Sequence, residues 1–182
     1  PDQKGRPIVE ALPQPLMESN RAIDRRNAFV MSSLLNEVTK TGTAAAAQKA
    51  LKRTDVYGKT GTTNGPMDVW FSSYNRDVVT TAWVGFDNYT PLGRKEFGGT
   101  AALPIWIEYM RAALKDSPQV ERPMPPGIVI VKIDSQTGQL ASAGQRNANF
   151  EYFKKENVPR RYGYGDSQSG DQGINTRISE IF

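Results

Sequence analysis

The chain has 182 residues, 38% of them apolar, and 23 Lys or Arg against 19 Asp or Glu give a net charge of +4. This size suits one domain or slightly more with a packed core, and the mild charge does not by itself indicate a nucleic-acid partner. The absence of histidine and cysteine excludes Ser-His-Asp triads, thiol catalysis, disulfides and metal sites built from these residues.

The start of the sequence has no leader pattern. Pro1-Asp2-Gln3 is neither an initiator methionine nor part of a signal peptide, and no apolar run approaches the roughly 18 residues that span a bilayer. We therefore expect a piece of a longer protein, with any anchor or targeting segment outside it. Residues 1–18 are rich in proline and are expected to form an irregular lead-in.

Two helices are expected next. Apolar residues recur at helical spacing over residues 25–40, after Asp24 as a suitable N-cap and before Gly42 as a C-terminal stop. Thr43 is expected to cap a second, shorter helix over residues 44–51, which ends in basic residues as a helix C-terminus favours.

The hydrophobic pattern then changes to that of strands. Residues 56–62, 69–74 and 78–86 are rich in β-branched and aromatic side chains. Turn residues separate them at 64–66 and 75–77. Three adjacent strands with short links imply an antiparallel sheet.

A third helix follows a glycine-rich loop. Thr100 is expected to open this helix, which would run to about Lys115. Its apolar residues form one stripe that would pack on the sheet, namely Leu103, Trp106, Ile107, Met110 and Leu114. The expected fold class is α/β, an antiparallel β-sheet with flanking helices.

The last third of the chain is expected to lie outside this unit. Residues 117–126 hold four prolines and read as a linker or an extended crossing segment. Residues 127–133 and 139–143 are predicted to pair as a hairpin around a turn at 134–138. Residues 162–173 have the polar, glycine-rich composition of a flexible tail.

The sharpest short motif is Lys59-Thr60-Gly61-Thr62 on the first predicted strand. Gly61 would let a ligand approach the backbone, and Lys59 and the hydroxyls would offer donors to an anion. The alternative is an edge strand with a solvated lysine. A second Lys-Thr-Gly begins at Lys40, at a predicted helix end where these residues are ordinary.

An ordered series of motifs gives these residues a context. The series is Gly58-Lys59-Thr60-Gly61-Thr62-Thr63-Asn64, Asp68-Val69-Trp70-Phe71, Ala82-Trp83-Val84-Gly85-Phe86-Asp87, Gly98-Gly99-Thr100-Ala101-Ala102, Asp134-Ser135-Gln136-Thr137-Gly138 and Phe150-Glu151-Tyr152-Phe153. From about Arg21 to Phe153, the sequence resembles the C-terminal part of the transpeptidase domain of class A penicillin-binding proteins of the 1A type. The resemblance implies the penicillin-binding and serine β-lactamase-like fold. Residues 19–116 would be the C-terminal part of that domain, and residues 117–182 the crossing segment, hairpin and tail.

The resemblance also implies an activity. Members of this family use a serine to attack the D-Ala-D-Ala end of a peptidoglycan stem peptide, and β-lactams acylate the same serine. The implied protein is a bifunctional peptidoglycan synthase, anchored in the bacterial inner membrane and facing the periplasm. Its expected partners are the stem peptide, β-lactams and the upstream part of the same protein. No cofactor, metal or nucleic acid is expected.

The chain departs from the family pattern at the nucleophile. No serine is followed three positions later by lysine, so the Ser-x-x-Lys motif is absent and is expected upstream of Pro1. Ser73-Tyr74-Asn75 matches the family's Ser-x-Asn, but it follows the Lys-Thr-Gly strand instead of preceding it. It also lies at a strand end, where Ser and Asn are common, and we interpret it as structural.

The resemblance assigns roles to the strand residues. Lys59 would hold positive charge beside the missing serine, and Gly61 would give clearance for the acyl group. Thr62 would bind the substrate carboxylate through its hydroxyl and supply one oxyanion donor through its N–H. Thr60 belongs to the same substrate-binding strand but should point away from Lys59 and be mainly structural, and Thr63 would border the cleft. Lys59 and Thr62 are thus the expected catalytic residues.

The tryptophans are expected in the core. Trp70, Trp83 and Trp106 each lie in a run of apolar neighbours, which favours burial over a sugar-binding platform. Without the helix that carries the nucleophile, however, Trp70, Phe71, Trp83 and Phe86 would lose part of their cover.

Two other functions fit parts of the sequence. A serine β-lactamase-like hydrolase shares the strand motif, but the proline-rich segment and the hairpin after Lys115 are unexpected in it. A non-catalytic sensor or scaffold of the same fold would explain the missing nucleophile equally well, if this were the whole chain.

The missing nucleophile gives a direct prediction. Because the 182-residue chain contains no Ser-x-x-Lys, the isolated polypeptide should form no covalent adduct with a fluorescent penicillin. The measurement is in-gel fluorescence with intact-mass analysis. A stable, stoichiometric acyl adduct on this chain would contradict our assignment of the nucleophile.

Overall fold

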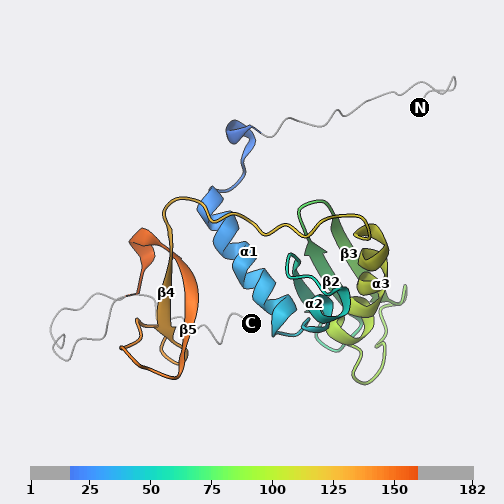
Figure 1. Ribbon diagram of the computed structural model, residues 1–182. Coiled ribbons are helices and arrows are strands. Elements are labelled where there is room, and N and C mark those ends of the chain that lie inside the picture. Colours follow the sequence, from blue (N-terminus) through green and yellow to red (C-terminus); the bar gives the residue numbers. More distant parts are fainter. Residues whose placement is uncertain (1–16, 160–182) are drawn as a thin grey trace.

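The computed structural model describes residues 17–159, so most of the expected lead-in and all of segment 162–173 lie outside the described residues. Helix α1 lies between a two-stranded hairpin and a three-stranded sheet that carries α2 and α3 (Figure 1). The elements in chain order are η1 (Glu18–Asn20), α1 (Arg25–Lys40), α2 (Ala46–Leu51), β1 (Tyr57–Thr62), β2 (Asp68–Tyr74), β3 (Val79–Gly85), η2 (Gly98–Ala102), α3 (Leu103–Ala113), β4 (Ile128–Asp134), β5 (Ala148–Lys154) and η3 (Lys155–Asn157). The predicted α/β class with an antiparallel sheet is confirmed.

Helix α1 begins and ends as its sequence predicts. The Asp24 carboxylate accepts hydrogen bonds from the N–H groups of Arg26, at 2.9 Å, and Asn27, at 3.3 Å. Beyond the other end, a Cβ on Gly42 would lie only 2.9 Å from the Cα of Val38. Gly42 therefore lets the departing chain pass close against the last turn of the helix.

Helix α2 does not begin as predicted. Thr43 does not cap it, because the helix starts at Ala46 after Ala45, which makes no side-chain cap. The N–H groups of Ala44, Ala45 and Ala47 are already bonded to backbone carbonyls, which removes the need for a capping hydroxyl. The Thr43 hydroxyl instead lies 2.9 Å from that of Thr60 on β1.

The main sheet has the strand order β1-β2-β3, antiparallel throughout, as predicted. Since side chains alternate along a strand, its two faces carry different sets. Val69, Phe71 and Ser73 are buried on the face that packs on the helices. This core consists of Val38, Ala44, Ala47, Val56, Val69, Phe71, Ala82, Ala102, Leu103, Trp106, Ile107, Met110 and Leu114.

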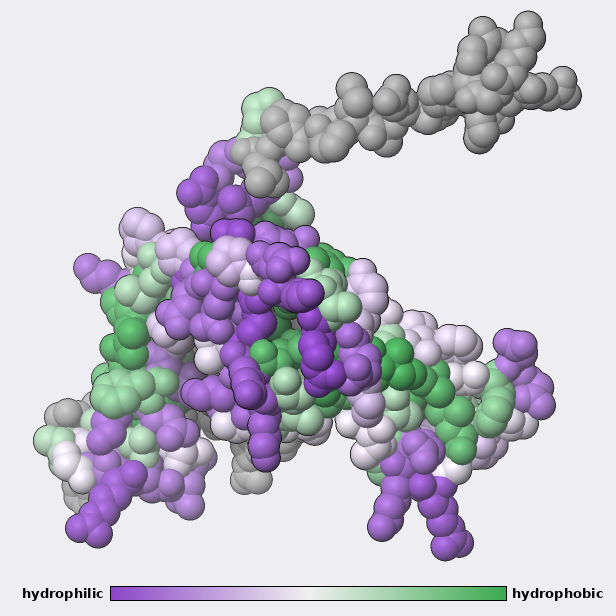
Figure 2. Space-filling view, turned by 45° about the vertical axis from the view of Figure 1, so that its right-hand side comes forward, coloured by the Kyte–Doolittle hydropathy of each residue, from purple (hydrophilic) through white to green (hydrophobic). Residues whose placement is uncertain are grey.

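The opposite face of the sheet is open. Trp106 is fully buried, but Trp70 is 43% and Trp83 45% exposed, so the expectation of a core position is wrong for these two within this chain. Phe86 is 53% exposed, whereas Phe71 is fully buried against Trp106. The cause is alternation, since Trp70 and Trp83 are cross-strand partners on the face opposite the buried Val69 and Phe71. On the face that Figure 2 presents, hydrophobic residues, in green, lie between hydrophilic ones, in purple.

The segment before α3 is a π-helical turn. The predicted start at Thr100 lies inside η2, and α3 itself runs from Leu103 to Ala113. The Thr100 hydroxyl accepts the Phe97 N–H at 2.8 Å and donates to the Lys95 carbonyl. The predicted apolar stripe of α3 is buried along its whole length.

A buried ion pair ties residues 117–120 to the core. Asp55 is 2% exposed and receives two hydrogen bonds from Arg53, each of 2.8 Å, and one from the Val120 N–H. The Arg53 guanidinium also donates to the carbonyls of Ser117 and Pro118. The proline-rich stretch is therefore an extended crossing segment that side chains hold in place.

The C-terminal hairpin pairs differently from the prediction. Strand β4 pairs with β5 and not with residues 139–143, which make only an isolated bridge from Leu140 to Ile133. Strand β5 is the better partner because its aromatic residues also pack on α1, as the edge-on contact of Tyr152 with Phe29 shows. The predicted turn is present, with Asp134 accepting two backbone N–H groups.

The Asp55 pair predicts a pH-dependent stability. Burial would raise the pKa of Asp55, yet the bonds from Arg53 and Val120 outweigh it and hold this pKa below its ordinary value. The stabilisation is therefore present above about pH 3.9, the ordinary value, and is lost as the pH falls through the lower folded value. Asp55→Asn in the longer protein should cost about 3 kcal/mol at pH 7, because Arg53 loses its buried counter-charge.

The readout is the thermal midpoint of both proteins between pH 7 and pH 2. The difference in thermal midpoint between wild type and Asp55→Asn should become smaller toward pH 2. Asp116→Asn, at an exposed acid on the same crossing region, is the control and should track wild type. A gap that stays constant with pH would contradict the prediction.

The open face of the sheet predicts that this chain needs its upstream part to fold. Each large apolar side chain left uncovered forgoes roughly 1.5–3 kcal/mol, against a total stability of about 5–15 kcal/mol. Trp70, Trp83 and Phe86 are all uncovered here. The isolated chain should therefore be molten or aggregate, and become ordered when joined to its upstream segment. A sharp, cooperative thermal transition of the isolated chain would show this to be wrong.

Candidate functional site

The motif strand β1 lies at the edge of the main sheet. Thr63 donates its N–H to the Asp68 carbonyl at 3.0 Å, on the side of β2. Because backbone groups along a strand alternate in direction, the polar backbone groups of Thr60 and Thr62 point to the other side. Among the described residues no strand pairs with that side. It therefore presents backbone donors and acceptors that no described strand pairs with.

Lys59 reaches this edge. Its side chain is exposed, and its ammonium group donates to the Thr60 carbonyl at 3.1 Å. In register it lies opposite Ser72, on the open face of the sheet. The positive charge is thus positioned where the open face meets the unpaired edge.

Thr60 and Thr62 share the other face of β1. They lie opposite Phe71 and Val69, both buried, so Thr60 does point away from Lys59 as expected. Thr62, two residues on, points the same way as Thr60. Its side chain is nevertheless exposed, and its hydroxyl accepts the Gly98 N–H at 3.1 Å. Lys59 and the Thr62 hydroxyl thus approach the edge from opposite faces.

Gly61 and Thr63 have clear structural roles. A Cβ on Gly61 would lie 3.3 Å from the Cβ of Trp70, so a side chain there would require Trp70 to shift slightly. The Thr63 hydroxyl accepts the N–H groups of Met67, at 3.2 Å, and Asp68, at 3.0 Å. It therefore closes the turn between β1 and β2 and fixes the end of the motif strand.

An aromatic patch extends the site across the open face. The rings of Trp70 and Trp83 lie 5.9 Å apart, and the Trp83 indole N–H donates to Asp68 at 2.9 Å. A Cβ on Gly85 would lie 2.4 Å from that carboxylate oxygen, so glycine leaves room for the pair. Sequence reasoning missed this cluster, although the strand spacing already placed Trp70 and Phe71 on opposite faces.

The second Lys-Thr-Gly and the Ser-x-Asn match do not join the site. Lys40 lies in the last turn of α1 and pairs with Glu37 at 3.5 Å, as a helix end predicts. The side-chain amide oxygen of Asn75 accepts hydrogen bonds from the backbone N–H groups of Asp77 and Val78 and so closes the β2–β3 turn. Ser73 is buried, and its hydroxyl has no partner among the described residues. Asn75 therefore serves the hairpin.

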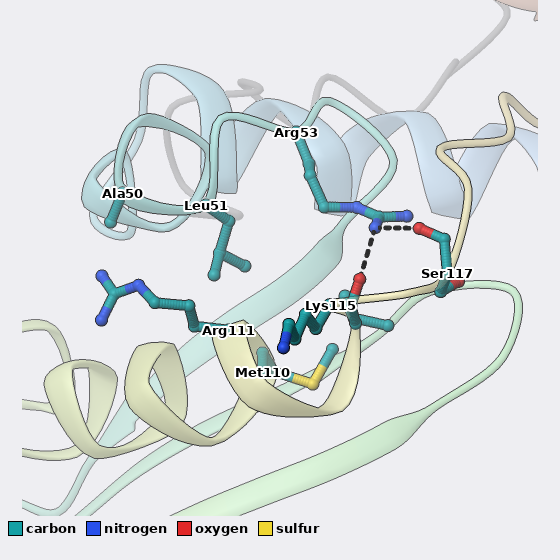
Figure 3. Close-up of a pocket in the computed structure, with 8 residues that line it drawn as sticks. Ala50, Leu51, Arg53, Met110, Arg111, Lys115 and Ser117 are labelled. Carbon is teal, nitrogen blue, oxygen red and sulfur yellow. Dashed lines mark hydrogen bonds between the residues drawn. The ribbon is translucent and has the colours of Figure 1, made fainter.

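A cavity of about 270 Å³ lies elsewhere, between α2 and α3. Leu51 and Met110 give it apolar walls, with Arg111 and Lys115 at its rim (Figure 3). The Arg53 side chain is engaged with Asp55 and with the carbonyls of Leu114 and Ser117, as the dashed lines to these carbonyls show. The Arg53 guanidinium at this cavity is therefore already paired with groups of the chain itself.

Residues 17–159 hold neither a metal-binding cluster nor a membrane-spanning helix. They contain no group of three or more Asp, Glu, His or Cys side chains arranged to hold a metal ion. None of their helices combines the length and apolar character of a membrane-crossing segment.

Comparisons with known proteins give close similarities. The chain is 55% identical to penicillin-binding protein 1A of Pseudomonas aeruginosa over 141 residues, which cover 78% of this chain and 17% of that protein. It is 46% identical to penicillin-binding protein 1A of Neisseria lactamica over 160 residues, covering 86% and 18% respectively. The crystal structure of penicillin-binding protein 1A from Haemophilus influenzae matches with a TM-score of 0.70 and 38% identity, over 76% of this chain and 22% of that one. No family model matches the chain. The chain spans less than a fifth of the length of these two curated relatives.

Proposed function

We propose, from the premise that this chain belongs to the penicillin-binding protein 1A family, that it supplies the substrate-binding strand of a peptidoglycan D,D-transpeptidase domain. The observation that carries the proposal is the unpaired edge of β1, with Lys59 beside it. The complete protein would be a bifunctional, membrane-anchored synthase acting at the periplasmic face of the inner membrane.

The edge suits an extended peptide. A peptide that lies along β1 gains backbone hydrogen bonds from the Thr60 carbonyl and the Thr62 N–H, as an added strand does. The D-Ala-D-Ala end of a stem peptide has this form and ends in a carboxylate. The Thr62 hydroxyl and the Lys59 ammonium lie on either side of the edge and suit that negative charge.

The reaction is acyl transfer through a serine outside this chain. The serine attacks the penultimate D-Ala carbonyl, the terminal D-Ala leaves, and an amine of a second stem peptide then takes the acyl group. The Thr62 N–H would stabilise the oxyanion together with the N–H of that serine. The loss of one such donor costs about 3 kcal/mol of transition-state stabilisation. The strand thus contributes to catalysis without holding the nucleophile.

The open face of the sheet supports a position for the upstream segment. Trp70 and Trp83 are exposed on the same face of the sheet as Lys59. The upstream segment that carries the serine would cover these indoles and bring its nucleophile to the Lys59 end of the face. β-Lactams would acylate the same serine, because their strained amide and carboxylate mimic the peptide end.

A serine β-lactamase-like hydrolase remains the alternative reaction. It would use the same strand but release the acyl group to water quickly. The lifetime of the penicilloyl adduct on the complete protein separates the two, since a transpeptidase holds the adduct and a β-lactamase turns it over. A complete protein that forms no adduct would favour the non-catalytic scaffold.

Lys59 gives the sharpest test of the proposal. In the complete protein, Lys59→Ala removes the charge at the edge but keeps the strand, so folding should change little. Acylation by a β-lactam should slow by roughly 10²-fold or more, the scale of losing one electrostatic or proton-transfer partner. The measurement is the second-order acylation rate, with thermal midpoints recorded in parallel.

Lys40→Ala, in the duplicate triplet, is the matched control. It removes an exposed lysine from a helix end and should cost at most a few tenths of a kcal/mol. It should leave the acylation rate unchanged. An equal slowing in both variants would mean that the active-site strand has been misassigned.

A further inference from the structure

Gly98 lies directly against the back of the motif strand. A Cβ at this residue would be 2.4 Å from the Trp70 carbonyl oxygen, 2.7 Å from the Gly61 carbonyl oxygen and 3.1 Å from the Cβ of Thr60. Gly98 thus packs directly on the backbone of Gly61 and Trp70, which are cross-strand partners. No side chain fits at this position without moving η2 away from the sheet.

The same close approach makes a specific hydrogen bond. Gly98 is the first residue of η2, and an N–H in the first turn of a helix has no acceptor within that helix. It donates instead to the Thr62 hydroxyl oxygen at 3.1 Å. Because that oxygen already accepts a hydrogen bond from the Gly98 N–H, the Thr62 hydroxyl is left with its own proton to donate.

The position of Gly98 is itself fixed from η2. Phe97, the residue before it, gives its N–H to the Thr100 hydroxyl at 2.8 Å, and the Phe97 carbonyl accepts the N–H groups of Thr100 and Ala101. These bonds hold the first turn of η2 in place and thereby direct the Gly98 N–H at Thr62.

We propose that Gly98 is a positioning residue for the transpeptidase site. It holds the Thr62 hydroxyl in the orientation that donates to the carboxylate of the bound peptide end or β-lactam. The inference rests on the proposed function and adds a residue that contacts no substrate. It also explains why a segment 36 residues further along the chain lies against the motif strand.

A double-mutant cycle in the complete protein tests this. The variants are Gly98→Ala, Thr62→Val and the two together, and the readout is the second-order rate of acylation by a fluorescent penicillin. Thr62→Val should slow acylation by roughly 10- to 100-fold, the scale of a hydrogen bond to a charged group. Gly98→Ala should slow it comparably, and the double variant should be no more than about threefold slower than Thr62→Val.

Thr62→Ser provides the conservative comparison. It keeps a hydroxyl, so its acylation should remain sensitive to Gly98→Ala, whereas that of Thr62→Val should not. The methyl ester of the same penicillin gives a second readout. Without the carboxylate, the losses caused by Gly98→Ala and Thr62→Val should both shrink, which a merely structural role would not produce.

Gly99→Ala is the matched control. Its Cβ would crowd the Thr43 carbonyl, at 2.8 Å, in the same turn but away from Thr62. The fold-decrease in acylation rate caused by Gly99→Ala should multiply with that caused by Thr62→Val, as independent effects do. If Gly98→Ala fails to fold, Thr100→Val replaces it. That variant removes the hydroxyl anchoring Phe97 without adding a clash, and it should show the same non-additivity.

The outcomes separate the inference from the proposed function. Gly98 or Thr100 effects that multiply with Thr62→Val, or a Gly98→Ala variant that acylates at the wild-type rate, would overturn the inference and leave the proposed function in place. A wild-type protein that is not acylated at all would overturn both. Non-additivity of Gly98→Ala or Thr100→Val with Thr62→Val, together with a Gly99→Ala effect that multiplies, supports the inference.

Discussion

The alternation of side chains along three short strands is the constraint on which the rest of the structure depends. It directs Val69 and Phe71 into the helices and leaves Trp70 and Trp83 on the open face. It also places Lys59 and Thr62 on opposite faces of one edge strand. A shift of β1 by a single residue would turn the Lys59 ammonium group toward the helix-covered face and the Thr62 hydroxyl toward the open face. The core packing therefore fixes the register of the site, and one set of contacts serves both stability and chemistry.

The elements that sequence reasoning predicted well are those decided by local chemistry. Asp24 caps α1, Lys40 and Gly42 mark its end, and the strand–turn–strand pattern gives the three-stranded sheet. The failures depend on contacts distant in sequence. Thr43 bonds to Thr60 and so does not act as a cap, and β4 chooses β5 because Tyr152 also reaches Phe29. The covered face of the sheet, and hence the exposure of Trp70 and Trp83, follows from helix placement that no local pattern records.

The candidate site shows the same division. The motif predicted a strand over Lys59 to Thr62, and the structure shows that strand. The contact with Gly98 could not be read from the motif, because Gly98 lies 36 residues after Thr62 and donates to it through a backbone N–H. Glycines at such contacts carry no chemical signature, and only a crowded position such as that over Gly61 and Trp70 reveals them. Rigid placement of functional groups depends on such supporting contacts as much as on the groups themselves.

The uneven burial of the three tryptophans has a practical consequence. Trp106 is fully enclosed, while Trp70 and Trp83 face solvent beside each other. Indole emission moves to shorter wavelength when water is removed from around the ring. The chain therefore carries an intrinsic optical reporter. When another segment covers this face of the sheet, the emission of Trp70 and Trp83 would shift to shorter wavelength. The emission of Trp106 would stay constant and provide a reference in the same spectrum.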